Sequence, residues 1–468
     1  MRIPCPQLWR APEQSQERNM NKSELQQHDR EHLLHPFTDF NDLGQQGTRV
    51  ITRAEGAYIT DIDGTRLLDG MSGLWCCNLG YSRKEISDAI YQQLNTLPFY
   101  NSFFQCTTVP SIELADALAE VTPAHMNNVF FTGSGSEAND TNLRLIRRFW
   151  DLQDKPEKRI VISRKNGYHG STIAGASLGG MSGMHKQFQP LDYIEHVQQP
   201  YWFAEGGDMS PEEFGIQAAR SLDEKIQELG PEKVAAFIAE PIQGAGGVVI
   251  PPETYWPEVK KVLEQYDILL VMDEVIFGFG RTGEWFGADY YGIKPDLMTF
   301  AKAVTNGYFP LGGTMVSDRV AEVIKSKGGE FTHGYTYSAH PAACMAGLAT
   351  INILRNEKII ENVRDVTGPY LAKRWAELAE HPIVGEARSL GMVGALELVK
   401  DKGSRARFDD DCTAGSVCRD LSIKHGLVMR AVGDAMVIAP PLIITTEQVD
   451  ELVEKAHRAL DDTAKALA

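Results

Sequence analysis

The sequence predicts an α/β fold, in which a mostly parallel sheet is sandwiched by helices and is followed by a smaller α+β domain. Three observations favour this class. From about residue 110 onward, apolar runs of strand length alternate with helical stretches. Continuous apolar strands separated by helices are typical of a parallel sheet buried on both faces. The chain has 468 residues, of which 43% are hydrophobic, and this is ample material for a large core.

The elements of the large sheet follow from these runs. A helix over 255–266 is the expected crossover between the third and fourth strands, and a long helix over about 341–356 follows the last strand. The expected strands cover residues 129–131, 160–162, 234–239, 268–272 and 297–300.

The remaining elements lie at the two ends of the chain. Residues 57–62 and 66–68 predict a hairpin around Asp63-Gly64, a favoured turn dipeptide. Residues 391–398 and 436–439 predict strands of the smaller domain. We therefore expect an N-terminal segment over 1–75, partly disordered over 1–30 and otherwise packed with the small domain. The large domain is expected over 76–345 and the small domain over 346–468.

The composition excludes several classes of function. The net charge of −17 disfavours nucleic-acid binding and a polybasic membrane contact. There is no apolar signal segment and no apolar run long enough to span a bilayer, so we expect a cytoplasmic location, with Met1 or Met20 as the start. No metal site or disulfide framework is expected, because the cysteines are scattered and form no C-x-x-C pair. They are Cys5, Cys76, Cys77, Cys106, Cys344, Cys412 and Cys418.

A glycine-serine turn follows the first strand of the sheet. Gly133, Ser134, Gly135 and Ser136 lie between that strand and a helix that opens at Glu137. Small residues and free helix amides at such a turn favour a bound phosphate. A plain flexible connection between strand and helix is an equally good interpretation of the turn taken alone.

The same turn also fits the dinucleotide-binding pattern Gly133-x-Gly135-x-x-Ala138, which raises an NAD(P)-dependent oxidoreductase as a competitor. That pattern needs an acidic residue at the end of the next strand to hold the ribose. Here the strand ends in Ser163-Arg164-Lys165, without an acid. The oxidoreductase is therefore disfavoured.

Three charged residues follow the later strands of the sheet. Glu240, Asp273 and Lys302 each come directly after an apolar run, and ligands bind at the carboxyl ends of parallel strands. Singly, each could be a turn former or a solvated side chain. Together with a phosphate turn, a strand-end Asp and a strand-end Lys meet the needs of pyridoxal phosphate. The Asp can keep the ring nitrogen protonated, and the Lys can hold the aldehyde as an imine.

These segments resemble the class III aminotransferases, which are fold-type-I pyridoxal-phosphate enzymes. The resemblance runs from about residue 35 to the C-terminus, and it is closest to the ω-aminotransferases that transfer amino groups from putrescine or polyamines to pyruvate. It rests on Ser134–Asn139, Glu240–Gly244, Asp273–Gly283 and Lys302, and more closely on Asp69–Trp75, Pro98–Phe104 and Gly207–Pro211.

The resemblance implies roles for individual residues. Lys302 would form the imine and move the proton, and Asp273 would hold the ring nitrogen protonated. The phosphate would be bound by Gly135 and Ser136, next to Ser134, and Tyr168 would stack on the ring. Glu240 would complete the cofactor site.

The resemblance also implies an active site shared between two subunits. Thr336, with Tyr335 beside it, would reach the phosphate of the neighbouring subunit, so a homodimer is expected, or a tetramer built from dimers. Trp75 and Phe103 would line the substrate pocket together with Tyr168. Each aromatic residue taken alone is equally typical of a core.

The position of an arginine predicts the amino acceptor. Many members of the class that use 2-oxoglutarate carry an arginine where this sequence has Val437, whereas the pyruvate-using group carries one that matches Arg430. A carboxylate needs a bidentate partner, and a simple amine does not. We therefore expect amino transfer from a primary amine, putrescine or another diamine, to pyruvate. A β-alanine or aryl-alkyl-amine donor and an aminomutase of the same fold stay open as alternatives.

Overall fold

The computed structural model describes residues 20–408 and 413–467. These residues divide into a smaller unit, formed by residues 20–54 together with Ile59–Arg66, and a larger unit that holds the rest of them. Of the stretch expected to be partly disordered, residues 1–19 lie outside the described residues and residues 22–30 belong to a helix. The first elements are α1 (Lys22–His32), α2 (Phe40–Gln46), β1 (Ile51–Glu55), β2 (Tyr58–Asp61) and β3 (Arg66–Asp69).

The expected N-terminal hairpin is confirmed. Strands β2 and β3 are neighbours, and the amide of Gly64 donates a hydrogen bond to the carbonyl of Asp61 at 3.0 Å across the turn. Asp61 Oδ1 also accepts from the amides of Asp63 and Thr65, as is usual for Asp in a turn.

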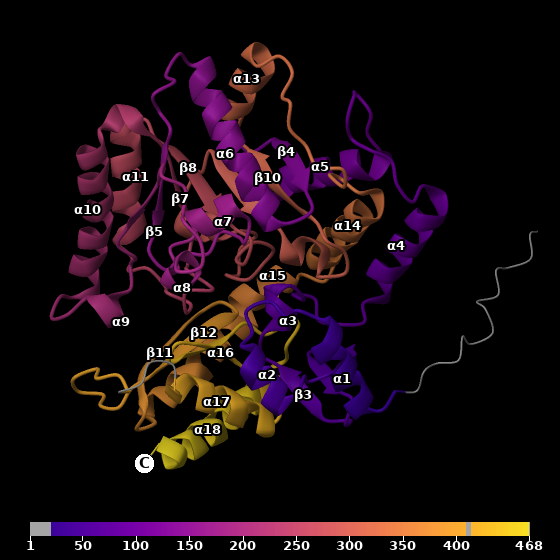
Figure 1. Ribbon diagram of the computed structural model, residues 1–468, viewed down its shortest axis with the longest axis vertical. Helices are drawn as coiled ribbons and strands as arrows, with labels where there is room; N and C mark the ends of the chain where they lie inside the picture. Colours follow the sequence, from indigo (N-terminus) through magenta and orange to yellow (C-terminus); the bar gives the residue numbers. More distant parts are fainter. Residues whose placement is uncertain (1–19, 409–412, 468) are drawn as a thin grey trace, which may run out of the picture. The chain divides into compact units, whose positions relative to one another are not determined.

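The larger unit is built on a seven-stranded sheet with the order β4-β10-β9-β8-β7-β5-β6 (Figure 1). All five strands predicted from the apolar runs are present. The pairs β5–β6, β5–β7, β7–β8 and β8–β9 are parallel, whereas β10 is antiparallel to both of its neighbours. The strands are β4 (Asn128–Thr132), β5 (Ile160–Arg164), β6 (Ile194–Val197), β7 (Val234–Ala239), β8 (Leu269–Asp273), β9 (Leu297–Phe300) and β10 (Gly312–Val316).

The central strands of this sheet are buried on both faces, which explains why β7 and most of β8 and β9 are apolar. Successive side chains of a strand point to opposite faces. In β8, Leu269 and Val271 cluster with side chains of α6 such as Phe149, whereas Leu270 and Met272 belong to the core that includes α10 and α11. Figure 1 shows α10 and α11 side by side. The sandwich of helices around a mostly parallel sheet is confirmed.

The helices of the larger unit include two whose bounds match the prediction, α11 and α14. Helix α6 lies against β4, β10, β9 and β7, and α14 packs against α4 and α5. Among the described residues, no helix is both long and apolar enough to cross a membrane. The main helices are α4 (Lys84–Thr96), α5 (Val109–Val121), α6 (Gly135–Leu152), α7 (Ile173–Leu178), α10 (Pro211–Leu229), α11 (Tyr255–Tyr266), α13 (Asp318–Lys327) and α14 (Pro341–Asn356).

A second, antiparallel sheet with the order β11-β12-β15-β14 occupies the C-terminal part of the chain. It contains the two strands that were predicted over 391–398 and 436–439. How the chain divides into a large and a small domain stays a prediction. The elements here are α16 (Gly368–Ala376), β11 (Val384–Leu390), β12 (Val393–Leu398), α17 (Thr413–Lys424), β13 (Leu427–Val428), β14 (Arg430–Val432), β15 (Ala435–Ile438) and α18 (Thr446–Leu467).

Candidate active site

Strand β4 leads directly into the glycine-serine turn and then into α6. Ser134 is the N-cap of the helix, and its Oγ accepts from the amide of Glu137 at 3.2 Å. Glu137 Oε2 accepts from the amide of Gly133 at 2.6 Å. The amides of Gly135 and Ser136 lie in the first helical turn, where no helical carbonyl can bond them. Together with the helix dipole, these amides favour an anion at this end of α6.

Close packing holds this turn in place. A Cβ atom added to Gly135 would lie 2.8 Å from Cγ2 of Val275, and one added to Gly170 would lie 2.6 Å from Oγ of Ser136. Gly170 has a φ of +127°, which favours glycine. The amide of Ser171 donates to Ser136 Oγ at 3.2 Å. The turn is therefore a rigid, close-fitting cup.

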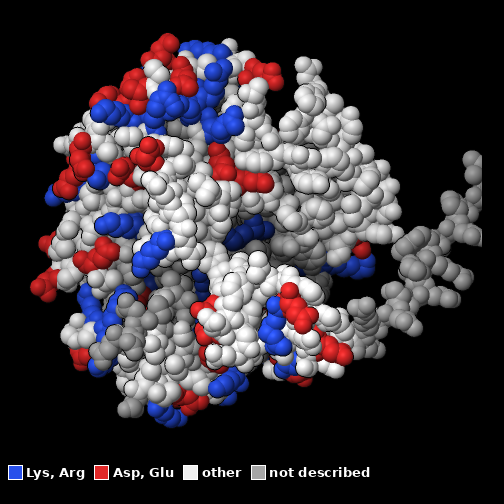
Figure 2. Space-filling model, viewed as in Figure 1, with Lys and Arg blue, Asp and Glu red and all other residues white. Residues whose placement is uncertain are grey.

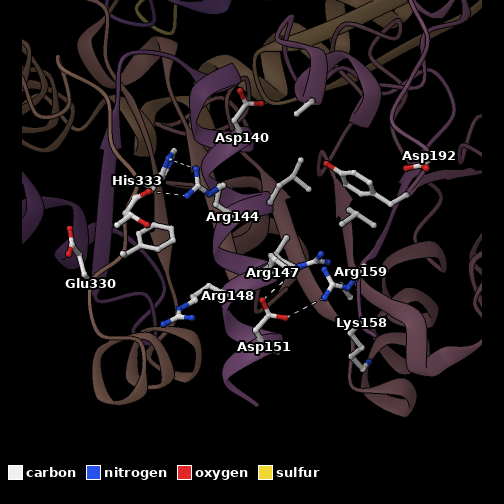
Figure 3. A pocket seen from close by; sticks show the side chains of 18 of the residues that line it. Asp140, Arg144, Arg147, Arg148, Asp151, Lys158, Arg159, Asp192, Glu330 and His333 are labelled. Atoms are coloured by element: carbon white, nitrogen blue, oxygen red, sulfur yellow. Dashed lines mark hydrogen bonds and ion pairs between the residues drawn. The ribbon is translucent and has the colours of Figure 1, made fainter. Parts of the chain in front are cut away.

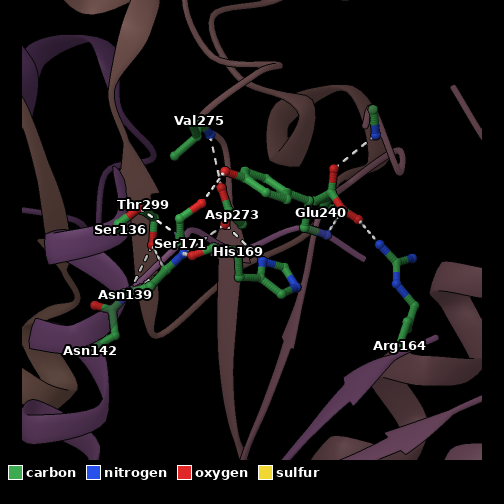
Figure 4. Close-up of polar contacts among 12 residues, drawn as sticks. Ser136, Asn139, Asn142, Arg164, His169, Ser171, Glu240, Asp273, Val275 and Thr299 are labelled. Carbon is green, nitrogen blue, oxygen red and sulfur yellow. Dashed lines mark hydrogen bonds and ion pairs between the residues drawn. The ribbon is translucent and has the colours of Figure 1, made fainter. Parts of the chain in front are cut away.

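Asp273 ends β8 and is almost completely buried, with three hydrogen bonds to its carboxylate (Figure 4). Oδ2 accepts from Asn139 Nδ2 at 2.9 Å and lies 2.8 Å from Nδ1 of His169. Oδ1 accepts from the amide of Val275 at 3.1 Å. Burial raises the pKa of Asp273, but the bonds to His169, Asn139 and Val275 outweigh it and hold the pKa below 3.8. Asp273 is therefore ionised at neutral pH.

Glu240 follows β7 and is also buried. Its Oε1 accepts from the amide of Tyr168 at 3.1 Å, and its Oε2 accepts from the amide of Gly244 at 2.8 Å. Burial raises the pKa of Glu240, which His169 partly opposes. The carboxyl group thus fixes the backbone of the segment that carries Tyr168 and His169, next to Asp273.

Lys302 follows β9 with a φ of +50°. A non-glycine residue in this region is strained by about 1–3 kcal/mol, and such strain is concentrated at functional sites. The side chain is half-buried. Burial lowers the pKa of the Lys302 amine below 10.5, although Asp273 and Glu240 nearby oppose the shift. A lowered pKa increases the neutral fraction of the amine, which is the form that can add to an aldehyde or accept a proton.

One cavity of about 370 Å³ brings these residues together. Its size is in the range of small-molecule and cofactor sites. The glycine-serine turn, Asp273, Glu240 and Lys302 all line it, as predicted from the strand ends. The residues lining it are Cys76, Gly133, Ser134, Gly135, Ser136, Asn139, Tyr168, His169, Gly170, Glu240, Asp273, Val275, Ile276, Ala301, Lys302, Thr305, Gly307, Phe309, Pro310 and Leu311.

Two further residues named from the sequence lie close to this cavity. The guanidinium of Arg430 lies 5.2 Å from the ring centroid of Trp75, which is a cation–π contact. Arg430 is near enough to Lys302 to lower the pKa of that amine. Burial lowers the pKa of Arg430 itself, opposed by Tyr168. In the register of β14 and β15, Arg430 is directly opposite Val437.

The remaining predicted residues do not line this cavity in the single chain. Phe103 packs against Gly334, where an added Cβ would lie 2.7 Å from the Phe103 ring. The hydroxyl of Tyr335 donates to the carbonyl of Glu137 at 3.2 Å, and Thr336 is exposed. Tyr335 lines a separate pocket of about 890 Å³ along α6. Figure 3 shows that arginines and carboxylates surround this larger pocket, but it contains neither Asp273 nor Lys302.

Sequence reasoning assigned no role to two residues that contact Asp273, namely His169 and Asn139. Asn139 lies four residues after Gly135, so it shares the helix face of the phosphate cup. It also accepts from Thr299 Oγ1 at 2.8 Å. His169 directly follows Tyr168, for which the sequence predicted a role. Helical spacing could have identified Asn139, whereas His169 is brought to Asp273 by a loop without a periodic signal.

The contact between His169 and Asp273 leads to a testable prediction. In His169→Ala the hydrogen bond is lost while burial remains, so the pKa of Asp273 rises. Because Asp273 must be ionised to act, the acid limb of kcat/KM should move to higher pH. Loss of a bond to a charged group should also weaken cofactor binding by roughly 10–100-fold. Stopped-flow rates and cofactor titration across pH would test this, with His185→Ala as the matched control. An unchanged acid limb would contradict the assignment.

The fold and the cavity define a fold-type-I pyridoxal-phosphate enzyme. In comparison with known families, residues 42–460 match the model of the family described as Aminotransferase class-III. The chain belongs to this family, and it is an aminotransferase.

Relatives and solved structures agree with this membership. The chain is 57% identical over 454 residues to the putrescine–pyruvate aminotransferase of Pseudomonas aeruginosa, covering 97% of this chain and 99% of the relative. It is 42% identical to the diaminobutyrate–2-oxoglutarate transaminase of Halomonas elongata, and the match covers 94% of this chain and 96% of that relative. The structure of the omega transaminase of Pseudomonas jessenii in complex with PMP matches with a TM-score of 0.93 and 41% identity, covering 95% of this chain and 99% of that one.

Class III aminotransferases use pyridoxal phosphate, and this chain has the residues to hold it. The cup formed by Gly135 and Ser136 suits the phosphate, since its helix amides have no helical partner. Asp273, which is buried and ionised, suits a protonated ring nitrogen, because a buried carboxylate is stabilised by a cationic partner. Lys302 lines the same cavity. The site therefore fits the cofactor at its phosphate, its ring nitrogen and its aldehyde.

Proposed function

We propose that the protein transfers an amino group from a primary amine, putrescine or another diamine, to pyruvate, which yields an aminoaldehyde and alanine. The observation that carries this proposal is the position of Arg430 next to the cavity, with Val437 directly opposite on β15. The relative of 57% identity, which is a putrescine–pyruvate aminotransferase, supports the same substrates.

Pyridoxal phosphate supplies an electron sink for the electron pair left when the substrate carbon loses its proton. The residues of the chain do the rest. Gly135 and Ser136 bind the phosphate, and Asp273 holds the proton on the ring nitrogen. Lys302 would move the proton from the substrate carbon to the aldehyde carbon of the cofactor in the first half-reaction and in the opposite direction in the second, which suits an amine of lowered pKa. The backbone amide of Tyr168 donates to Glu240, and the side chain of Tyr168 would flank the ring of the cofactor.

Arg430 distinguishes the two substrates by charge. Pyruvate carries a carboxylate, which a guanidinium binds through two hydrogen bonds. A diamine carries cations and is repelled by the same group. The contact with Trp75 provides a position in which the guanidinium is stabilised when no carboxylate is bound. Arg430 would thus bind pyruvate in one half-reaction and lie on Trp75 in the other.

An engineered relative of known structure supports the pocket proposed here. It is a thermostable omega transaminase variant in which a tryptophan, a phenylalanine and an arginine are replaced, engineered for the synthesis of bulky amines. That tryptophan and phenylalanine are separated by the same number of residues as Trp75 and Phe103. We propose that Trp75, Phe103 and Arg430 limit the size of the amine in this protein.

A panel of amine donors with pyruvate tests the proposal. Putrescine and cadaverine should give alanine at higher kcat/KM than β-alanine or an aryl-alkyl amine. Alanine released in step with pyruvate consumed would also distinguish amino transfer from an aminomutase, which consumes no pyruvate. No alanine from any diamine would contradict the proposed donor class. Family membership leaves no support for the alternative of an NAD(P)-dependent oxidoreductase.

We also propose that the active enzyme is a homodimer or a tetramer of dimers. An apolar surface runs over α4, α5 and the loop between them, and Figure 2 shows few charged side chains over α5 and this loop. Monomers rarely expose so many large apolar side chains together. Tyr337 joins this surface through an edge contact with Phe99 at 5.8 Å. Its exposed members include Tyr91, Leu94, Leu97, Phe99, Tyr100, Phe104, Val109 and Ile112. The cytoplasmic location stays a prediction.

Thr336 provides a test of the shared site. If its hydroxyl reaches the phosphate in the partner subunit, Thr336→Ala removes a bond to a charged group, which contributes about 1.5–3 kcal/mol. Cofactor affinity should fall roughly 10–100-fold, while the sedimentation coefficient stays that of a dimer. Thr332→Ala, in the same exposed segment, is the matched control. A fully active monomer in sedimentation would contradict the shared site.

A further inference from the structure

The loop over 243–249 is completely buried and strained. Gln243 and Val249 bond to each other through both amides, at 3.1 and 2.9 Å. Val248 has a φ of +52°, a region that β-branched residues rarely adopt. Such a conformation persists only where the surroundings hold it firmly. The contacts that hold Val248 therefore decide where this loop lies.

Arg388, on β11 of the C-terminal sheet, makes two of those contacts. Its Nε donates to the carbonyl of Val248 at 2.7 Å, and its Nη2 donates to the carbonyl of Gly247 at 2.6 Å. The two bonds flank the strained residue. The planar fork of arginine suits two adjacent carbonyls, whereas the point charge of a lysine does not.

Acidic and aromatic neighbours hold Arg388 in turn. Its Nη2 lies 2.7 Å from Glu397, its Nη1 lies 2.5 Å from Glu386, and its guanidinium lies 5.2 Å from the ring of Tyr201. Burial lowers the pKa of Arg388, but Glu397, Tyr201 and Glu386 together raise it above its usual value. The guanidinium thus stays charged and fixed in one orientation.

The far side of the loop contacts the active site. The amide of Gly244 donates to Oε2 of Glu240, whose Oε1 accepts from the amide of Tyr168. Asn166 Nδ2 donates to the carbonyl of Gly246 at 2.9 Å. A shift of the loop would therefore move Glu240 and the segment from Asn166 onward, which carries Tyr168 and His169.

We propose that Arg388 is a positioning residue of the aminotransferase. Although its contacts are to the loop and not to the cavity, it fixes loop 243–249 and, through Gly244 and Glu240, sets the position of Tyr168 and His169 against the cofactor. The inference rests on the proposed cofactor-binding roles of Glu240 and Tyr168. It connects the C-terminal sheet to the cofactor site by a route that does not involve Arg430.

A double-mutant cycle on cofactor binding tests this route. The apoprotein is titrated with pyridoxal phosphate, followed by fluorescence and visible absorbance, for Arg388→Met, Glu240→Gln and the double variant. Each single variant should raise the cofactor Kd by about tenfold. If Arg388 acts through Glu240, the cofactor Kd of the double variant should be about as high as that of one single variant, because the effects of coupled residues are not additive. If the fold-increase in Kd of the double variant equals the product of the two single fold-increases, the proposal is overturned.

Two further variants separate positioning from general stability. Arg388→Lys should fail to restore cofactor affinity even where thermal unfolding shows a folded protein, because it cannot bond both carbonyls. Arg374→Met removes another arginine that bridges two carboxylates, Glu377 and Asp450, and should leave the cofactor Kd unchanged. If Arg374→Met lowers the cofactor affinity as much as Arg388→Met does, the effect of Arg388→Met is one of general stability and not of positioning. No amine or pyruvate is needed, so the outcome is independent of the proposed substrates.

Discussion

Lys302→Ala should give a folded protein that lacks the imine absorbance of the bound cofactor and has essentially no amino transfer. Lys302 is the one lysine that lines the cavity in the described part of the chain, and in the proposed function both the covalent link to the cofactor and the proton transfer depend on its amine. General acid–base catalysis alone contributes about 10²–10⁴-fold. We therefore expect each half-reaction to slow by at least that range, as measured by stopped-flow absorbance.

Covalent trapping gives this prediction a second readout. Borohydride reduction should attach the cofactor to Lys302 in the unmodified protein, and peptide mass spectrometry would identify the site. Lys294→Ala, an exposed lysine shortly before β9, should keep full activity and the same adduct. If Lys302→Ala still gives a covalent adduct, another amine holds the cofactor.

Arg430→Ala should slow the half-reaction with pyruvate and leave the half-reaction with putrescine nearly unchanged. Pyruvate loses its bidentate partner, and a desolvated contact of this kind contributes a few kcal/mol, so kcat/KM for pyruvate should fall roughly 10²-fold. Putrescine has no carboxylate, and its half-reaction should change little. Arg430→Lys should not restore the pyruvate half, because an ammonium lacks the planar fork.

Single-turnover kinetics of the two halves, measured separately, would settle the role of Arg430. Arg419→Ala, an arginine of α17 that pairs with Asp420, is the matched control and should leave both halves intact. Equal losses in both halves would mean that Arg430 supports the structure of the pocket. If the half-reaction with pyruvate is unchanged in Arg430→Ala, another residue binds the carboxylate of pyruvate.

The large sheet was predictable because burial on both faces leaves a direct pattern in the sequence. The runs that became β7, β8 and β9 are almost entirely apolar, and α11 and α14 have the predicted bounds. Strand β10 (Gly312–Val316) was missed because it begins with two glycines, which weaken the strand signal. Those glycines are needed, since a Cβ on Gly312 would lie 2.6 Å from the backbone of Ser134.

The site was predictable only where a strand end determines the position of a side chain. Glu240, Asp273 and Lys302 meet at one cavity because parallel strands bring their carboxyl ends to one edge. His169 was missed because a loop carries it there. The resemblance, and not the residue pattern, suggested Phe103 and Thr336. Neither lines the cavity of its own chain, and in the proposed shared site Thr336 acts in the neighbouring subunit.

Competition between two acceptors tests the central claim most directly. The purified protein would be given putrescine together with equal concentrations of pyruvate and 2-oxoglutarate, and alanine and glutamate would be quantified at early times. With Arg430 next to the cavity and Val437 opposite it, alanine should exceed glutamate by more than about tenfold, because 2-oxoglutarate carries a second carboxylate to which Val437 offers no cationic partner. Glutamate formed as fast as alanine, or faster, would contradict a pyruvate-using enzyme.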